Sequence, residues 1–330
     1  MGGSGNFFLQ LQGPGIYHGG EAVTGELQVF CHEDDTKVKD IQIGLQGFCD
    51  VCWDECNCND DCNCTPYTNH EQYISEKLFV HSGALGSGSH IFPFSFLLPS
   101  SLPCTFKGDY GEVKYFIEAE MDRSGIFTSN KRVEQMITIA SICDLNNIPK
   151  VLEPLACSNS ITYGIMCCKS KPLSATVTIP RQGYIPGEII PVTAVIENHS
   201  GKDIISTKAL ISQVAVFKSK RGRIIHSTKT LTTALGVSIG PDNSFSWNGQ
   251  VETPFVAASS LQGCTAMEVF YRIEFMVDVR FGSELILTIP IMIGNVSWRR
   301  CTQGIASEKP DPSHNIDSKP PIWTIPNVPQ

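Results

Sequence analysis

The sequence lacks the features of an exported or membrane-spanning chain. Its first residues show no basic segment followed by an apolar run, and its longest apolar stretch, 285–296, is broken by Pro290. A helix needs about 20 consecutive, mainly apolar residues to cross a bilayer. We therefore expect neither a signal peptide nor a membrane span.

Positive charge is also scarce. The 330 residues include 25 Lys and Arg against 33 Asp and Glu, which gives a formal net charge of -8 at pH 7. Proteins that bind nucleic acid generally carry a basic surface that neutralises phosphates. The charge balance therefore argues against nucleic acid as a general partner.

Recognisable catalytic motifs are missing as well. Neither G-x-S-x-G nor H-E-x-x-H occurs, and the eight histidines are dispersed along the chain. The acid pairs Asp34-Asp35 and Asp60-Asp61 lie in polar segments, where solvation is their ordinary role. We therefore expect that the protein is not an enzyme.

The sequence does contain one strand-like segment twice. The pattern E-V-x-Y-x-I-E occurs at 112–118 and again at 268–274, with apolar residues at alternate positions. This period of two is typical of a half-buried antiparallel strand, so Tyr115 and Tyr271 are predicted to face a core. The 28 Gly and 20 Pro add many turn signals. Together these features predict an all-β fold.

Two further matches show that the repeat extends over a whole domain. The triplet S-S-L occurs at 100–102 and 259–261, and Y-x-x-G-E occurs at 17–21 and 184–188. Because the matches keep the same order in each half, the sequence predicts a duplicated β domain. A chain of this length suits two domains that each bury their own core.

Breaks in the apolar period predict the domain boundaries. We expect a first domain over 1–143 with a Cys-rich loop inserted at 49–64, and a second domain over 173–297. The intervening segment 144–172 contains several prolines and is predicted to be a linker. The remaining 298–330 are rich in Pro, Ser, Asp and Lys, so we expect a disordered tail.

Several of these motifs resemble the arrestin family, and specifically the arrestin-domain-containing proteins called α-arrestins. The match rests on G-E-A-V-T-G at 20–25, F-P-F-S-F at 92–96, G-Y-I-P-G-E at 183–188 and I-P-I-M-I-G at 289–294. The resemblance implies two immunoglobulin-like β-sandwiches in tandem, of the arrestin N and C type.

The same resemblance implies a function that the residue patterns alone do not reach. It implies a cytosolic adaptor that links membrane-protein cargo to endocytic sorting, protein transport or ubiquitination machinery. The partners would be cytosolic tails of membrane proteins, and the protein would work in the cytoplasm, at the plasma membrane or at endosomes.

A dense group of cysteines is the strongest chemical signal in the sequence. It comprises Cys49, Cys52, Cys56, Cys58, Cys62 and Cys64, with His70 shortly after. Thiolates and an imidazole at this density suit a structural zinc ion, the only cofactor that the sequence suggests.

Two other interpretations of the Cys-rich segment stay open. In one, the cysteines make the protein responsive to thiol oxidation on an arrestin-like scaffold. In the other, the segment is an inserted loop whose cysteines have no role. In either case we expect thiols rather than disulfides in a chain without an export signal.

One compact basic run stands out. Lys218, Lys220, Arg221 and Arg223 surround Gly222, which places them at a hairpin tip. Such a tip can contact an anionic lipid head group or a phosphorylated peptide. The simpler alternative is a solvated turn.

The tail generates a first testable prediction. Many α-arrestins carry Pro-Pro-x-Tyr motifs that bind WW domains of ubiquitin ligases, whereas this chain has Pro320, Pro321 and then Trp323. The indole loses at least one hydrogen bond of the tyrosine hydroxyl, worth about 1 kcal/mol. A peptide of residues 315–330 should therefore bind WW domains more weakly than its Trp323→Tyr version. Equal affinities in a titration would instead restore direct recruitment of a ligase.

Overall fold

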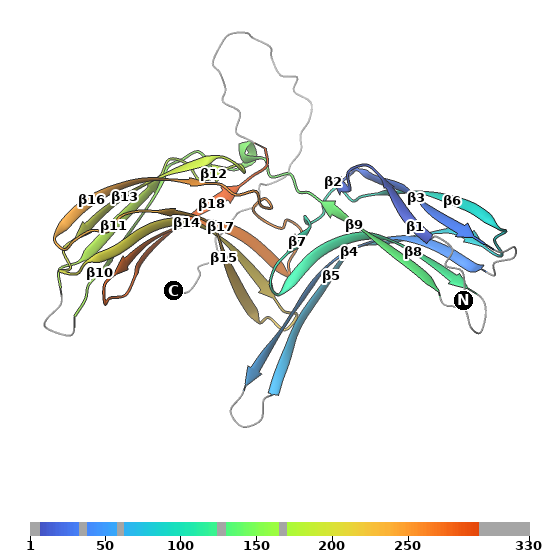
Figure 1. The fold of residues 1–330 in the computed structure, drawn as a ribbon, viewed down its shortest axis with the longest axis horizontal. Coiled ribbons are helices and arrows are strands. Elements are labelled where there is room, and N and C mark those ends of the chain that lie inside the picture. The colour runs from blue at the N-terminus through green and yellow to red at the C-terminus, as the bar shows by residue number, and fades with distance from the viewer. Residues whose placement is uncertain (1–6, 33–37, 58–62, 124–129, 165–169, 297–330) are drawn as a thin grey trace, which may run out of the picture. The chain divides into compact units, whose positions relative to one another are not determined.

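The computed structural model describes residues 7–32, 38–57, 63–123, 130–164 and 170–296, and almost all regular structure in them is β-strand (Figure 1). Two groups of mainly antiparallel sheets follow each other along the chain, and each larger sheet includes one short parallel pair, β2 with β9 or β12 with β18. Each group consists of a smaller and a larger sheet whose facing sides supply buried apolar residues, so the all-β fold with two tandem sandwiches is confirmed.

The first sandwich contains the strands that precede residue 140. They are β1 (Phe7–Gln12), β2 (Ile16–Tyr17), β3 (Ala22–Cys31), β4 (Val38–Asn57), β5 (Asn63–Ser82), β6 (Gly88–Leu97), β7 (Phe106–Lys107), β8 (Gly111–Arg123) and β9 (Lys131–Ile139). The smaller sheet has the order β1-β3-β6, and the larger has the order β2-β9-β8-β4-β5 with β7 paired to β8.

The second sandwich contains the strands that follow the single short 3-10 helix Leu145–Asn147 of the described residues. They are β10 (Leu155–Ile161), β11 (Leu173–Ile179), β12 (Gly183–Tyr184), β13 (Ile189–Asn198), β14 (Ile204–Lys218), β15 (Ile224–Leu235), β16 (Asn243–Glu252), β17 (Met267–Val279) and β18 (Leu285–Ile293). The sheets have the orders β10-β11-β13-β16 and β12-β18-β17-β14-β15. Within the described residues, no helix is long and apolar enough to cross a bilayer.

The repeated strands form the centre of both cores. In β17 every second side chain is buried from end to end, and Tyr115 on β8 and Tyr271 on β17 are fully buried. The prediction for both tyrosines is therefore confirmed. Their hydroxyls donate hydrogen bonds of 2.7 Å to the backbone carbonyls of Pro103 and Ala257, respectively.

A glycine on the neighbouring strand makes room for the first of these tyrosines. A Cβ atom at Gly47 would lie 2.2 Å from Cδ1 of Tyr115, well inside van der Waals contact. The ring of Tyr115 therefore packs against the backbone of β4 at Gly47, the residue opposite it in the β-ladder.

The segment predicted to be a linker is partly regular. Residues 155–161 form β10, which pairs along its whole length with β11 and so extends the second sandwich. The expectation of an inter-domain linker over 144–172 is wrong for 155–161, because these residues are a strand of the second sandwich. Most side chains of β10 are exposed or half-buried, which explains why the apolar period of the sequence did not show the strand.

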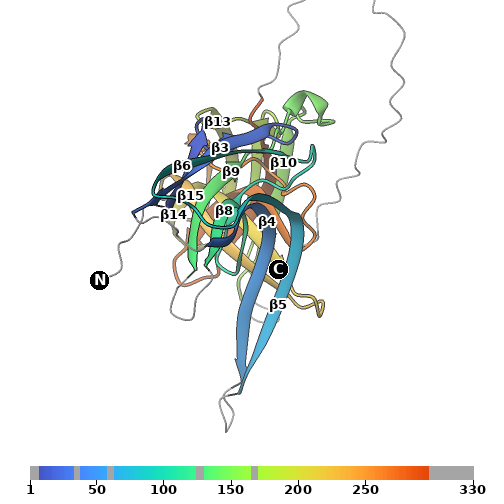
Figure 2. The ribbon, with the colours of Figure 1, turned by 90° about the vertical axis from the view of Figure 1, so that its right-hand side faces the viewer.

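The Cys-rich segment is also more regular than expected. Strands β4 and β5 form one hairpin whose pairing continues from Asp40↔Ser82 to Asn57↔Asn63. Strand β8 accompanies β4 only as far as Val51, so the outer part of the hairpin extends past the sheet (Figure 2). The expectation of a loop over 49–64 is therefore wrong, because 49–57 and 63–64 are strand.

The buried tyrosines lead to a test of the strand phase. Replacing Tyr115 or Tyr271 by Ala should lower the free energy of unfolding by about 3 to 5 kcal/mol, because each leaves a cavity in a packed core. Replacing Lys114 by Ala should cost less than about 1 kcal/mol, since its ion pair with Glu112 is partly exposed. Chemical unfolding measures the free energy of unfolding of all three variants. A larger decrease for Lys114→Ala than for Tyr115→Ala would show that Lys114, not Tyr115, faces the core.

Candidate functional site

The outer hairpin has two chemically different faces because successive side chains of a strand point to opposite sides. We call one the docked face, and it carries the side chains of Cys49, Val51, Trp53, Glu55, Thr65, Tyr67, Asn69 and Glu71. We call the other the free face, and it carries those of Asp50, Cys52, Asp54, Cys56, Cys64, Pro66, Thr68 and His70.

Burial separates these two faces. On the docked face, Val51 is 1% exposed and Trp53 is 4% exposed. Their chain neighbours Cys52 and Asp54, on the free face, are exposed. The Trp53 ring stacks on that of Tyr67, opposite it in the ladder, with ring centroids 5.4 Å apart. A hairpin that extends past its sheet thus keeps a buried aromatic side.

The docked face contacts the turn between β14 and β15. This turn is closed by hydrogen bonds from the backbone N–H of Ser219 to the Arg223 carbonyl and from that of Gly222 to the Ser219 carbonyl. Gly222 has a positive φ of 80°, a conformation that favours glycine. The sequence prediction of a turn at this glycine is borne out by the backbone.

Three groups join the turn to the hairpin. The backbone N–H of Lys220 donates to the Thr68 carbonyl at 2.9 Å, and the Asn69 side-chain amide donates to the Lys218 carbonyl at 2.9 Å. The Arg223 guanidinium donates to both carboxylate oxygens of Glu55, at 2.9 and 3.0 Å. This bidentate geometry is the favoured one for an Arg–carboxylate pair.

The ion pair also shifts the ionisation of its partners. The hydrogen bond from Arg223 lowers the pKa of Glu55, and the hydrogen bond to Glu55 raises the pKa of Arg223. Because the Arg223 side chain is 59% exposed and that of Glu55 is 35% exposed, the pair sets the orientation of the turn more than it stabilises the fold.

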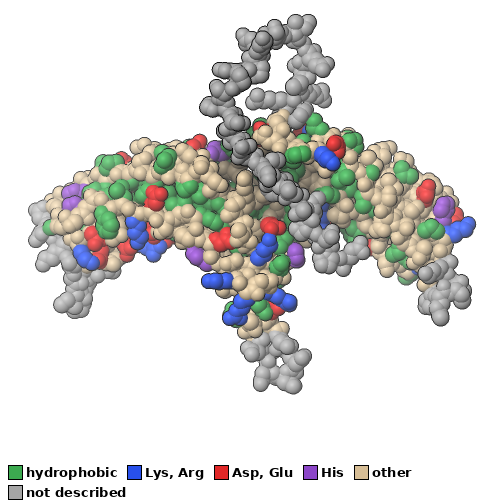
Figure 3. Space-filling model, turned by 180° about the vertical axis from the view of Figure 1, so that it is seen from behind, with side chains coloured by type: hydrophobic (Ala, Val, Ile, Leu, Met, Phe, Trp, Pro, Cys, Tyr) green, Lys and Arg blue, Asp and Glu red, His purple; other side chains and the backbone are tan. Residues whose placement is uncertain are grey.

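The structure divides the predicted basic cluster into two pairs. Arg223 is paired with Glu55, and Lys218 forms a close ion pair with Glu268. For Lys220 and Arg221, no ion pair with a described residue is recorded. Figure 3 shows Lys and Arg side chains gathered on the lower part of the projection at the centre of the molecule.

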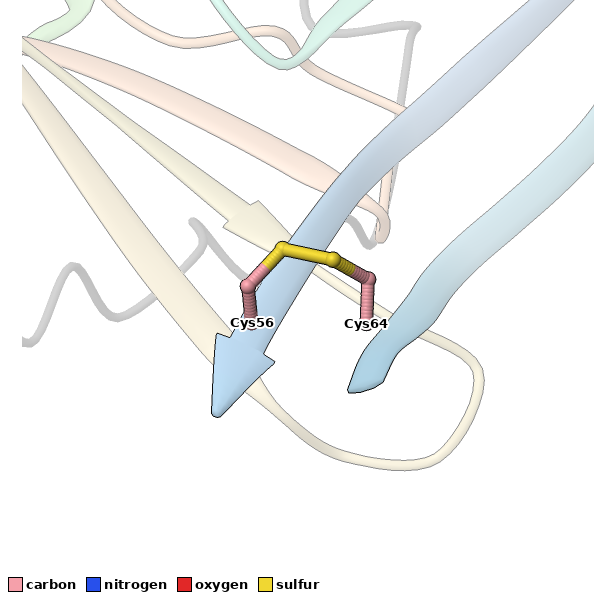
Figure 4. The surroundings of a disulfide bond; sticks show 2 residues. All are labelled: Cys56 and Cys64. Carbon is pink, nitrogen blue, oxygen red and sulfur yellow. A yellow bond between two sulfur atoms is a disulfide. The ribbon is translucent and has the colours of Figure 1, made fainter. Parts of the chain in front are cut away.

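The predicted metal ligands do not come together on the described part of the hairpin. Cys56 and Cys64 lie opposite each other in the ladder, with Cα atoms 4.0 Å apart, and form a disulfide (Figure 4). The expectation of thiols throughout is therefore wrong for this pair. The register explains it, since the two strands place these side chains side by side on the free face.

The other predicted ligands are dispersed or lie elsewhere. Cys49 is fully buried on the docked face, while Cys52 is exposed and about 13 Å along the strand from Cys56. His70 contacts the Asp50 carboxylate at 2.6 Å, and this hydrogen bond raises the pKa of the imidazole. Cys58 and Cys62 lie outside the described residues.

The zinc hypothesis therefore gains no support from this geometry. Within the described ranges, no group of three or more His, Cys, Asp or Glu side chains could hold a metal ion. The predicted motif of Pro320, Pro321 and Trp323 also lies outside the described residues.

The inner end of the docked face forms a second polar contact that the sequence analysis did not identify. Glu71 accepts hydrogen bonds from the backbone N–H of Thr265, at 3.0 Å, and from the Thr265 hydroxyl. Glu71 also accepts from the Tyr73 hydroxyl at 2.8 Å. Burial raises the pKa of Glu71, but these hydrogen bonds outweigh it and hold the pKa below its usual value.

Two thiols meet beside this carboxylate. Cys49 lies opposite Glu71 in the ladder, and Cys264 immediately precedes Thr265. Interaction with Cys264 is the main cause of a raised pKa at Cys49, and the same interaction lowers the pKa of Cys264. One signal was present in the sequence, because a cysteine follows the repeated S-S-L triplet in each half, at Cys104 and Cys264.

Comparison with known proteins identifies both halves of the chain. The family model described as Arrestin (or S-antigen), N-terminal domain matches residues 7–146. The model described as Arrestin (or S-antigen), C-terminal domain matches residues 169–297. The two matches together cover most of the chain in the order that the duplicated pattern predicted.

Individual relatives agree with these matches. Arrestin domain-containing protein 1 of Homo sapiens is 26% identical over 280 residues, which are 84% of this chain and 62% of that protein. Its Mus musculus counterpart is 27% identical over 248 residues, 75% of this chain and 56% of that protein. Arrestin domain-containing protein 4 of Homo sapiens is 26% identical over 300 residues, 86% of this chain and 69% of that protein. The chain thus spans about three fifths of the protein 1 relatives.

The two-faced hairpin can be tested with neighbouring residues of one strand. Replacing Trp53 by Ala should lower the free energy of unfolding by about 3 to 5 kcal/mol, because it empties a buried aromatic site. Replacing Asp54 by Ala, one position along on the free face, should change it by no more than about 0.5 kcal/mol. Equal effects in denaturant unfolding would show that the hairpin has no buried face.

Proposed function

Because this chain belongs to the arrestin family, we propose that it is an adaptor that brings membrane-protein cargo to endocytic sorting, protein transport or ubiquitination machinery. The observation that carries the proposal is the pair of consecutive arrestin domain matches over 7–146 and 169–297. On this proposal the protein works in the cytoplasm, at the plasma membrane or at endosomes.

We propose that an extended cytosolic tail of the cargo pairs with an exposed strand edge. Strand β5 is the last strand of its sheet and β15 is the last strand of the larger sheet of the second sandwich. The edge of such a strand offers backbone N–H and C=O groups to an incoming peptide. Each of these edge strands also carries an exposed apolar side chain. Phe79 on β5 is 69% exposed, and Leu235 at the end of β15 is 80% exposed.

The basic turn adds an electrostatic contribution in this proposal. Lys218 and Arg223 are engaged with Glu268 and Glu55, so Lys220 and Arg221 are the side chains available to an anionic surface. We propose that these two contact acidic lipid head groups when the adaptor meets its cargo at the membrane. Each basic residue near an anionic bilayer contributes about 1 kcal/mol.

Recruitment of a ubiquitin ligase is proposed to be indirect. The sequence pattern at 320–323 ends in Trp rather than the Tyr of a WW ligand, so a second partner with a complete motif would supply the link.

The adaptor proposal predicts a defined set of neighbours in cells. Proximity labelling with the full chain should enrich membrane proteins with cytosolic tails, together with sorting or ubiquitination factors, over the labelling enzyme alone. Synthetic tails from the enriched proteins should then bind the purified chain in a titration. A labelled set without membrane proteins or sorting and ubiquitination factors would contradict the adaptor role.

Matched variants distinguish a strand edge from the open face of a sheet. Phe79→Asp should weaken binding of a cargo tail, because Phe79 lies on the edge strand β5 and is 69% exposed. Val195→Asp should leave binding unchanged, since Val195 is 46% exposed on β13 and is paired with β11 on one side and β16 on the other. Equal weakening by both variants would show that the edge of β5 is not the binding site.

The membrane contact has its own test. Replacing both Lys220 and Arg221 by Ala should weaken binding to vesicles that contain phosphatidylserine and a phosphoinositide by about 25-fold, from about 1 kcal/mol per residue. Replacing the exposed Lys77 and Lys229 by Ala removes the same charge elsewhere and should have a much smaller effect. Similar losses in both double variants would mean that only net charge matters.

A further inference from the structure

We propose that Cys49 and Cys264 form an oxidation site in which a hydroperoxide converts the two thiols into a disulfide that joins the two sandwiches. The two residues come from different domains of the chain, on β4 of the first sandwich and just before β17 of the second. The inference does not depend on the identity of the cargo or on the adaptor role.

Backbone pairing and side-chain contacts bring the two residues together. Cys49 lies directly opposite Glu71 in the β4–β5 ladder, where facing Cβ atoms are about 5 Å apart. Glu71 in turn accepts the backbone N–H of Thr265 at 3.0 Å and its hydroxyl, and Thr265 follows Cys264. The two thiols are close enough for each to shift the pKa of the other.

The local structure holds Cys264 in place. Its sulfur accepts the backbone N–H of Met267 at 3.2 Å, and its own backbone N–H donates to the Leu261 carbonyl at 2.9 Å. These bonds form a tight turn that precedes the long central strand β17. The sulfur therefore keeps its position beside the first sandwich without help from a ligand.

Exposure assigns different roles to the two sulfurs. Cys264 is partly exposed, whereas Cys49 is fully buried. A small oxidant therefore reaches Cys264 first, and Cys49 reacts afterwards as the neighbouring thiol. Reactive cysteines beside a second thiol are the ones that pass from sulfenic acid to a disulfide.

The chemistry balances with one hydroperoxide per disulfide. The Cys264 sulfur attacks the peroxide, forms an S–O bond and breaks the O–O bond, which leaves a sulfenic acid and one water or alcohol. The Cys49 sulfur then attacks the Cys264 sulfur, the S–O bond breaks, and the Cys49 proton leaves with the hydroxyl group as water. Two thiols are oxidised by two electrons, and the peroxide is reduced.

The other described cysteines of the hairpin lack this arrangement. Cys52 is exposed on the free face of the hairpin, and Cys56 and Cys64 are already joined to each other. Cys104 is buried near the same region and provides a control thiol of similar surroundings. The proposed link therefore differs from the disulfide near the tip, which connects two strands of one domain.

Peptide mapping of the wild-type chain tests the proposal directly. The purified full chain at about 10 µM is treated with hydrogen peroxide, alkylated, digested without reductant and analysed by mass spectrometry. Cross-linked peptide of Cys49 and Cys264 should exceed any intermolecular pair by about 100-fold, because neighbouring groups have effective concentrations in the mM range. Oxidation of Cys264 to sulfinic acid, or to a pair with another cysteine, without this peptide would overturn the proposal.

Variants separate the two steps. In Cys49→Ser the sulfenic acid at Cys264 loses its partner, so labelling of Cys264 by a sulfenic-acid-reactive diketone should rise above that of the wild type. In Cys104→Ser the labelling and the cross-link should stay at wild-type levels. Unchanged labelling in Cys49→Ser would show that Cys49 does not react with Cys264. The peptide mapping of the wild-type chain uses no variant, so it tests the proposal even if one of these variants fails to fold.

Discussion

The alternation of side chains along each strand is the constraint on which the rest of this structure depends. It puts Tyr115 and Tyr271 into the two cores, where each hydroxyl reaches a backbone carbonyl. It also gives the hairpin of β4 and β5 one buried face and one exposed face. A shift of one residue in register would move Trp53 to the solvent and Asp54 to the buried side.

The contact between the hairpin and the second sandwich combines interactions of different strength. The Glu55–Arg223 pair is exposed, and such pairs orient groups more than they stabilise them. The hydrogen bonds from the Lys220 backbone N–H to the Thr68 carbonyl and from the Asn69 amide to the Lys218 carbonyl join uncharged groups, so they are less sensitive to salt. We therefore expect high salt to weaken the ion pair while the hairpin keeps its place.

The same hairpin relates the proposed functions to one another. Its tip carries the Cys56–Cys64 disulfide, its middle contacts the basic turn, and its inner end brings Cys49 to Cys264. Oxidation at the inner end would tie together the domains between which the hairpin already forms contacts. The proposed membrane contact involves Lys220 and Arg221 and the proposed oxidation involves Cys49 and Cys264, so the two can be tested separately.

Local patterns in the sequence determined the strand phase, the duplicated β domains and the arrestin resemblance, because each depends on residues close together in one segment. The period of two around Tyr115 and Tyr271 is an example. The same period of two continues at Val51 and Trp53, but the density of cysteines in this segment led to the prediction of a loop. Only the tertiary structure decided which of the 14 cysteines meet, since strand register pairs Cys56 with Cys64 and domain contact brings Cys49 to Cys264. The same holds for β10 and for the partners of Lys218 and Arg223, because those contacts join residues far apart in the chain, and no local period encodes them.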